Sequence, residues 1–311
     1  IMIQKIRIAT RQSRLALWQT EYVADTLRRA HPDVEIEIVP MSTRGDEILD
    51  RSLTKVGGKG LFIKELEVAM MEDRADIAVH SMKDVPWDMP EGMRIGAVLQ
   101  RADPGDAIVA KDGKDSLSAL PRNAVVGTSS LRRQAQILAV RPDLEVKPVR
   151  GNVETRLRKL DEGEFDAVIL AAAGLKRLGL GGRITGRLQM EECLPAVGQG
   201  VIGIECRSGD EDILEALYSI EHGATRRCVN AERGFAEELQ ASCESPIAAD
   251  GEVRDSEIFL RGVVATPDGG RVLRGSTRGS PTDGISLGKE LATELKMKGA
   301  DELLEAVRES S

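Results

Sequence analysis

Aromatic side chains are scarce in this chain: Phe, Trp and Tyr together make up 3% of its 311 residues. Proteins that bind single-stranded nucleic acid stack bases on aromatic rings, so the composition argues against this class of partner. Positive charge is also in short supply, because 51 acidic residues outnumber 43 basic ones and give a net charge of −8. Nucleic acid and anionic membranes both require a broad basic surface, and we expect neither as a partner.

Long apolar runs and cysteine motifs are missing as well. No segment approaches the about 18 consecutive apolar residues of a membrane span, and the N-terminus enters a predicted strand without a signal-peptide core. We therefore expect a cytoplasmic protein. The four cysteines, at positions 193, 206, 228 and 243, lack Cys-x-x-Cys or His-paired spacing. This pattern predicts neither a metal site nor a redox motif.

Predicted strands and helices alternate through the first two thirds of the chain. Apolar patterns predict strands at 3–9, 34–39, 77–79, 107–110, 124–126, 144–149 and 167–170, with helices at 15–29, 64–72, 131–140 and 153–161. Such alternation is typical of βαβ units and predicts parallel sheets. Because the pattern restarts after Asp103-Pro104-Gly105, we expect two α/β units.

The glycine-punctuated segment 195–200 leads into an apolar run at 201–206, which we interpret as a return to the first unit. Two chain crossings between paired α/β domains predict a hinged clamshell with a ligand cleft at the strand ends. Beyond about residue 218, consecutive strands followed by helices indicate a small α+β domain. The predicted domains are 1–100 with 200–217, then 101–199, and finally 218–311.

Polar groups follow the predicted strand at 77–79. Ser81, Lys83 and Asp84 come before Pro86, which ends the element. The carboxyl end of a strand is where open α/β sheets bind ligands. An isolated Lys-Asp pair on a loop is more often merely solvated, and a strand-end histidine such as His80 is more often structural.

Hydroxyl groups and cations near other predicted strand ends argue for a ligand. They are Arg11, Ser13, Thr128, Ser129, Ser130, Arg132, Arg133, Arg150, Arg156 and Arg177. Arginine binds carboxylates through two parallel N–H bonds, and helix N-termini favour anions. Although each arginine alone is also compatible with a solvated helix face, the set predicts a small polycarboxylate ligand.

Two loops carry further candidates. The glycine-rich segment 55–62 lacks phosphate-loop spacing, and we interpret it as a mobile loop over the cleft, with Lys55, Lys59 and Phe62 as its functional residues. A passive surface turn is the alternative. Cys243 follows a predicted helix at 226–239 in a loop where an exposed thiol could react, although an unreactive surface cysteine fits the same pattern.

At these residues the chain resembles the hydroxymethylbilane synthase family, also called porphobilinogen deaminases, of tetrapyrrole and heme biosynthesis. The segments that carry the resemblance occur in the family's order along nearly the whole chain. They are 7–13 (Arg-Ile-Ala-Thr-Arg-Gln-Ser), 56–62 (Val-Gly-Gly-Lys-Gly-Leu-Phe), 78–86 (Ala-Val-His-Ser-Met-Lys-Asp-Val-Pro), 126–133 (Val-Gly-Thr-Ser-Ser-Leu-Arg-Arg), 150–152 (Arg-Gly-Asn), 173–177 (Ala-Gly-Leu-Lys-Arg) and 194–200 (Leu-Pro-Ala-Val-Gly-Gln-Gly).

The resemblance implies a fold of two periplasmic-binding-protein-like (type II) α/β domains plus a small C-terminal α+β domain. It also implies a dipyrromethane cofactor, covalently attached through Cys243. Around this cysteine the sequence Ala-Ser-Cys-Glu-Ser departs from the family's commoner Gly-Gly-Cys-Gln-Val, and Arg14 stands where a proline is common. A monomer is the family expectation, and we expect no metal ion.

The implied reaction is that of a transferase. Four porphobilinogen molecules lose ammonia and are joined head to tail on the dipyrromethane, and hydrolysis then releases hydroxymethylbilane. Asp84 matches the family's catalytic carboxylate, which is anionic at neutral pH and suited to stabilise a developing cation. The implied cofactor-binding residues are Ser81, Lys83, Thr128, Ser129, Ser130, Arg132, Arg133 and Arg156, and the implied substrate-binding residues are Arg11, Ser13, Arg150, Arg156, Arg177 and Gln199.

Two other functions remain open from the sequence. A non-catalytic clamshell receptor for an anionic metabolite would explain the cleft but would have no use for Cys243 or Asp84. An inactive paralogue that still carries the dipyrrole would keep both residues.

Overall fold

The computed structural model describes residues 3–42 and 63–310. The chain forms two compact units, Ile1–Ala102 with Val201–Arg226, and Asp103–Gly200 with Arg227–Ser311. The chain thus leaves the first unit after Ala102 and returns to it at Val201. Lys55, Lys59 and Phe62, the predicted residues of a mobile loop, lie outside the described residues.

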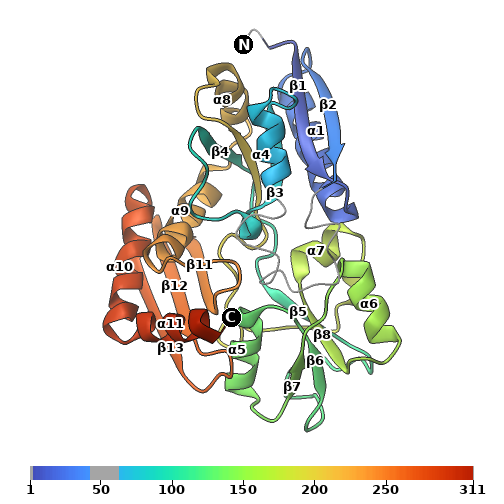
Figure 1. The fold of residues 1–311 in the computed structure, drawn as a ribbon, viewed down its shortest axis with the longest axis vertical. Coiled ribbons are helices and arrows are strands. Elements are labelled where there is room, and N and C mark those ends of the chain that lie inside the picture. Colours follow the sequence, from blue (N-terminus) through green and yellow to red (C-terminus); the bar gives the residue numbers. More distant parts are fainter. Residues whose placement is uncertain (1–2, 43–62, 311) are drawn as a thin grey trace. The chain divides into compact units, whose positions relative to one another are not determined.

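The first unit contains a five-stranded sheet in the order β2-β1-β3-β10-β4. Its elements are β1 (Lys5–Arg11), α1 (Arg14–Ala30), β2 (Glu35–Met41), α4 (Lys64–Met71), β3 (Ile77–Ser81), the 3₁₀ turn η1 (Met82–Asp84), β4 (Met93–Val98), β10 (Ile202–Arg207) and α8 (Glu211–Tyr218) (Figure 1). β1 runs parallel to β2 and β3, whereas β10 is antiparallel to both β3 and β4. The predicted parallel pairing is confirmed for β1, β2 and β3, but the sheet as a whole is mixed, because the returning strand β10 fills the place between β3 and β4 in the opposite direction.

Alternating side chains give this sheet two apolar faces. Ile8 of β1 packs with Val23 and Leu27 of α1 on one face. Ala78 of β3 packs with Leu66 of α4 on the other. Helices on both faces of a mixed sheet are the expected α/β arrangement and leave the strand ends accessible.

The second unit begins with a sheet that repeats this design in the order β7-β6-β8-β5-β9. Its elements are β5 (Asp106–Ala110), β6 (Val125–Gly127), α5 (Leu131–Val140), β7 (Glu145–Lys147), α6 (Val153–Asp161), β8 (Ala167–Ala171), α7 (Ala172–Arg177), η2 (Gly181–Arg183) and β9 (Gly186–Arg187). Here β5 is the antiparallel strand, and it holds the fourth place that β10 holds in the first sheet. Both predicted α/β sheets are thus present, and each contains one strand, β10 or β5, that runs antiparallel to the strands on both sides of it.

A three-stranded antiparallel sheet and its helices complete the second unit (Figure 1). They are α9 (Gly223–Glu238), β11 (Ile247–Arg254), β12 (Glu257–Ala265), β13 (Val272–Gly279), η3 (Pro281–Asp283), α10 (Gly284–Met297) and α11 (Ala300–Ser310). Phe235 of α9 and Leu291 of α10 pack with Leu260 of β12 in one core. The α+β prediction is therefore confirmed.

The two sheets of the second unit share a small apolar contact. Ala135 of α5 and Leu194 pack against Ala248 and Val263 of the antiparallel sheet. This contact lies within one compact unit, so the predicted boundary between a second and a third domain stays a prediction. Among the described residues, no helix is long and apolar enough to cross a membrane.

Close packing of α9 and α10 yields a test of the fold. A Cβ atom built on Gly288 would lie 2.6 Å from the backbone nitrogen of Phe235, an atom that cannot move aside without shifting α9. We expect Gly288→Ala to lower the free energy of unfolding by about 1–3 kcal/mol through overpacking. Gly182→Ala is the matched control, because no atom lies within 4 Å of its added Cβ. Equal denaturation midpoints for the two variants would contradict the α9–α10 packing.

Candidate functional site

Lys83 and Asp84 lie on a turn that is anchored from behind. Met82 is buried, and its N–H donates to the Val201 carbonyl at 2.9 Å. Gly203 makes room for it, because a Cβ atom there would lie 2.9 Å from the Cγ of Met82. Lys83 is half-buried and Asp84 is exposed. The turn therefore presents the Asp84 carboxylate to solvent on a fixed base.

The other predicted residues of the first unit lie at the same edge of its sheet. Arg11 ends β1, Ser81 ends β3, and the two strands are parallel neighbours. Ser13 accepts the Ala16 N–H at 3.3 Å as the N-cap of α1. Ser81 and Gln19 of α1 exchange hydrogen bonds of 3.0 and 3.2 Å. Ser13 and Ser81 thus have structural bonds as well as the positions predicted for binding.

Behind the turn, His80 and Glu205 form a buried pair that sequence reasoning did not anticipate. The His80 Nε2 lies 2.8 Å from the Glu205 Oε2, and both residues are less than a tenth exposed. The expectation that His80 is structural agrees with this contact. Glu205 carried no local signal, because it lies within an otherwise apolar strand and only β-sheet pairing brings it to β3.

The charges of this pair also shift the pKa of a third titratable group, Glu67 on α4. Burial, and next the negative charge of Glu205, raise the pKa of Glu67 to about 7, while His80 and Lys64 act in the opposite direction. Because the raised pKa favours the protonated form, the folded unit holds a proton near neutral pH that the unfolded chain has released.

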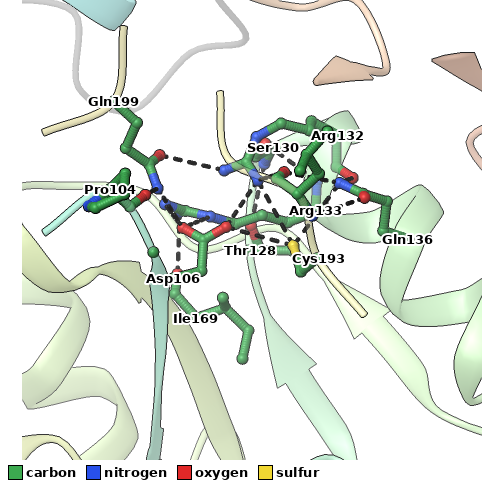
Figure 2. Close-up of polar contacts among 12 residues, drawn as sticks. Pro104, Asp106, Thr128, Ser130, Arg132, Arg133, Gln136, Ile169, Cys193 and Gln199 are labelled. Carbon is green, nitrogen blue, oxygen red and sulfur yellow. Dashed lines mark hydrogen bonds and ion pairs between the residues drawn. The ribbon is translucent and has the colours of Figure 1, made fainter. Parts of the chain in front are cut away.

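A cluster of buried charges in the second unit surrounds Asp106, the first residue of β5 (Figure 2). Asp106 is 0% exposed, and Arg132 and Arg133 are each 5% exposed. Arg132 Nη1 donates to Asp106 Oδ2 at 2.7 Å, and Arg133 Nη2 donates to Asp106 Oδ1 at 2.8 Å. Desolvation opposes ionisation of Asp106, but the two guanidinium groups outweigh it and hold the pKa of this carboxyl far below its usual range.

Further polar groups close this cluster. The Gln199 amide donates to Asp106 Oδ1 at 2.9 Å and to the Pro104 carbonyl at 2.7 Å. The Cys193 thiol donates to Asp106 Oδ2 at 3.3 Å, and burial together with the Asp106 charge raises the pKa of this thiol to about 12. Cys193 is therefore neutral, and two arginines face one carboxylate. The buried cluster carries one net positive charge.

The hydroxyl groups of the three residues before α5 make hydrogen bonds within the second unit. Ser130 caps the helix by accepting the Arg133 N–H at 3.3 Å, and Thr128 accepts the Ser130 N–H at 3.2 Å. Ser129 is exposed and donates to the Val149 carbonyl at 2.8 Å. The structure thus brings the predicted residues 128–133 together with Gln199.

The remaining predicted arginines are partly exposed at other loops of the second unit. Arg150 ends the segment after β7, and Arg156 Nε donates to the Gly151 carbonyl at 2.8 Å. Arg177 Nη2 donates to the Gly200 carbonyl at 2.9 Å. These bonds hold Arg156 and Arg177 against turns, and Arg177 also borders the segment that carries Gln199.

Cys243 lies in a short turn closed by the two flanking serines. Ser242 donates its N–H to Ser245 Oγ at 2.9 Å, and the Ser245 N–H returns to the Ser242 carbonyl at 3.0 Å. Cys243 itself is exposed, whereas the other three cysteines are buried. The residues that depart from the family pattern therefore build a turn that exposes the thiol. In the described part of the chain, no group of three or more potential ligands could hold a metal ion.

Comparison with protein families now gives these features a context. The family model "porphobilinogen deaminase, dipyromethane cofactor binding domain" matches residues 6–215, and that of the porphobilinogen deaminase C-terminal domain matches residues 226–297. The chain belongs to the porphobilinogen deaminase family. The resemblance noted from the sequence motifs is thus confirmed, and with it an enzyme class of tetrapyrrole biosynthesis that acts on porphobilinogen and binds dipyrromethane.

Several solved structures are similar to about 70% of this chain. The VFT2 domain of BvgS from Bordetella pertussis is 16% identical, with 70% of this chain and 86% of that chain covered and a TM-score of 0.44. An ancestral arginine-binding protein is 20% identical, with 71% and 92% covered and a TM-score of 0.37. An arginine-specific periplasmic binding protein from Salmonella typhimurium is 12% identical, with 70% and 92% covered and a TM-score of 0.39. The α/β fold class rests on the strand orders above.

The proton held by Glu67 makes stability depend on pH. Its pKa is raised from 4.5 to about 7 in the folded chain, so the unfolded state binds fewer protons between these values and stability falls as pH rises through them. We expect Glu67→Gln to flatten this fall, measured as urea midpoints from pH 5 to 8. Asp33→Asn, which removes an exposed carboxylate of the same unit, should leave the slope unchanged. A native slope in Glu67→Gln would be incompatible with the raised pKa.

Proposed function

We propose that this member of the porphobilinogen deaminase family is a hydroxymethylbilane synthase. It deaminates four porphobilinogen molecules, condenses them head to tail on a covalent dipyrromethane, and releases hydroxymethylbilane by hydrolysis. The observation that carries the proposal is the exposed Asp84 carboxylate, held on a fixed turn in a chain of this family.

Asp84 serves the deamination step. When porphobilinogen loses ammonia, its C–N bond breaks with the electron pair going to nitrogen, and a positive charge develops on the methylene-pyrrole. A carboxylate fixed beforehand stabilises this charge and accepts the pyrrole N–H, without reorganising as the reaction proceeds. The buried Met82 and the Val201 carbonyl supply this fixed position.

The cations of the second unit fit a ligand with several carboxylates. The cluster of Arg132, Arg133 and Asp106 has one positive charge in excess, and burying an uncompensated charge is unfavourable. A carboxylate of the dipyrromethane would compensate it. We assign cofactor carboxylates to Ser81, Lys83, Thr128, Ser129, Ser130, Arg132, Arg133 and Arg156, and those of incoming substrate to Arg11, Ser13, Arg150, Arg156, Arg177 and Gln199.

Cys243 fits the attachment point of the dipyrromethane, because its thiol is exposed on a hydrogen-bonded turn. Bound dipyrromethane supplies the pyrrole carbon to which the first substrate unit is joined. A non-catalytic receptor is disfavoured, because binding an anionic metabolite would require neither this thiol nor a carboxylate placed beside Lys83.

Attachment through Cys243 has a direct mass signature. We expect the purified chain to exceed its sequence mass by two pyrrole units, and Cys243→Ser to lack this excess. Cys228→Ser, at a buried cysteine, is the control that should keep the excess. Intact-protein mass spectrometry after incubation with porphobilinogen checks this, and a modified Cys243→Ser chain would exclude the attachment.

Loss of the Asp84 charge should affect turnover rather than folding. We expect Asp84→Asn to lower kcat at least about 100-fold, the size of losing one pre-positioned electrostatic contact. Its mass excess and denaturation midpoint should stay native, because Asp84 is exposed. Glu91→Gln removes another exposed carboxylate from the loop that follows and should retain activity. Turnover of Asp84→Asn within about threefold of native would refute the catalytic role.

A further inference from the structure

Asp106 belongs to no predicted set of site residues, yet it contacts three of them. We propose that Asp106 is a positioning residue for carboxylate binding: it fixes the orientation of Arg132 and Arg133 and limits their net charge to match one ligand carboxylate. The identity of that carboxylate, from dipyrromethane or porphobilinogen, rests on the proposed function. The positioning itself rests on the geometry within the second unit (Figure 2).

The Asp106 carboxylate is saturated by donors. Its Oδ1 accepts from Arg133 Nε at 3.1 Å, from Arg133 Nη2 at 2.8 Å and from the Gln199 amide at 2.9 Å. Its Oδ2 accepts from Arg132 Nη1 at 2.7 Å and from the Cys193 thiol at 3.3 Å. A carboxylate offers about four lone-pair positions, so five donors leave no acceptor capacity and no rotational freedom. Asp106 thus has no capacity left for a substrate N–H group.

Backbone carbonyls also hold the two arginines. Arg133 Nη1 donates to the Ile169 carbonyl at 3.1 Å, and Arg132 Nη1 donates to the Leu194 carbonyl at 2.8 Å. Arg132 Nη2 reaches Gln199 only at 3.4 Å, and its Nε makes no hydrogen bond within the described residues. Arg132 therefore keeps N–H donors for a ligand while its guanidinium plane is fixed by Asp106.

The net charge of the cluster distinguishes two ways in which the arginines could bind an anion: in an orientation fixed by Asp106, or by electrostatic attraction alone. Arg132 and Arg133 contribute two positive charges and Asp106 one negative charge, because the Cys193 thiol is neutral. Asp106→Asn raises the net charge of the cluster from one to two while keeping the size of the side chain. If the arginines act by charge alone, this change strengthens anion binding. If Asp106 positions them, the same change weakens it.

A second carboxylate in the chain provides a matched control. Asp76, in the first unit, accepts from Arg7 Nε at 3.0 Å and from Arg207 Nη2 at 3.4 Å, and its side chain is 12% exposed. Asp76→Asn therefore also removes a carboxylate between two guanidinium groups, at the end of β3 remote from Asp84. It should cost stability without changing how readily the chain acquires the dipyrromethane.

The first test measures the ratio of chains with and without the two-pyrrole mass excess after incubation with a limiting concentration of porphobilinogen. We expect Asp106→Asn to lower this ratio of loaded to unloaded chain at least about tenfold, the size of one charge-assisted hydrogen bond to a cofactor carboxylate. Asp76→Asn should keep the native ratio. An unchanged or higher ratio in Asp106→Asn would overturn the proposal. A wild-type chain with neither turnover nor a pyrrole mass excess would instead overturn the proposed function.

The second test does not depend on turnover. Selective ¹⁵N-arginine labelling of the Cys243→Ser chain, which carries no cofactor, reports hydrogen exchange at each arginine Nε–H. We expect Asp106→Asn to accelerate exchange at Arg133 at least about tenfold, because its Nε–H loses a carboxylate acceptor. Exchange at Arg7 should stay native in this variant. Native exchange at Arg133 would show that Asp106 does not fix it.

Asp106→Asn leaves two buried cations facing each other and could prevent folding. The double variant Asp106→Asn/Arg133→Met restores one net positive charge and replaces the broken ion pair with an apolar side chain, a change that proteins often tolerate. Compared with Arg133→Met alone, it should show a lower ratio of loaded to unloaded chain, because Arg132 has lost its positioning carboxylate. Equal ratios in these two chains would refute the proposal.

Discussion

The buried ion cluster around Asp106 is the interaction on which the second unit depends. It joins the start of β5, the first turn of α5 and the segment 193–199, which are far apart in the sequence. Gln199 also bonds the Pro104 carbonyl at 2.7 Å, so the two places where the chain enters and leaves the second unit's first sheet are fixed together. A single carboxylate thus organises both the crossing points and the two arginines that we propose to bind a ligand carboxylate.

A second buried carboxylate extends this arrangement to the C-terminal part of the unit. Glu232 of α9 is 0% exposed and accepts the Gly198 N–H at 2.7 Å and the Gly251 N–H at 2.8 Å. Gly198 has a φ of +72°, which a side chain would disfavour, and it immediately precedes Gln199. Helix α9, which precedes the Cys243 turn, is therefore linked through the Glu232–Gly198 hydrogen bond to Gln199, the residue that contacts Arg132.

Much of the fold could be predicted because its helices have clear local signals. The predicted bounds of α5 and α6 agree with the structure at both ends, since Ser130 and Asn152 act as side-chain N-caps. The six-residue helix α7 and the two-residue strand β9 were missed because such short segments show no resolvable period. Strand direction was also missed, because the pairing of β10 depends on a crossing about a hundred residues long, not on its own residues.

The predicted site shows the same division between local and long-range information. Cations at strand ends are visible in the sequence, but their counter-charge is not, because Asp106 simply precedes an apolar strand and meets the arginines only through tertiary contact. Burial of Arg132 and Arg133 is also compatible with a purely structural role, which their bonds to Asp106 would satisfy. The charge count argues otherwise: a structural cluster gains most from neutrality, and this cluster keeps one positive charge that a structural role would leave uncompensated. A structural role and a binding role are therefore compatible for Arg132 and Arg133. The rigid contact with Asp106 fixes the direction in which their guanidinium groups can donate hydrogen bonds to a ligand carboxylate.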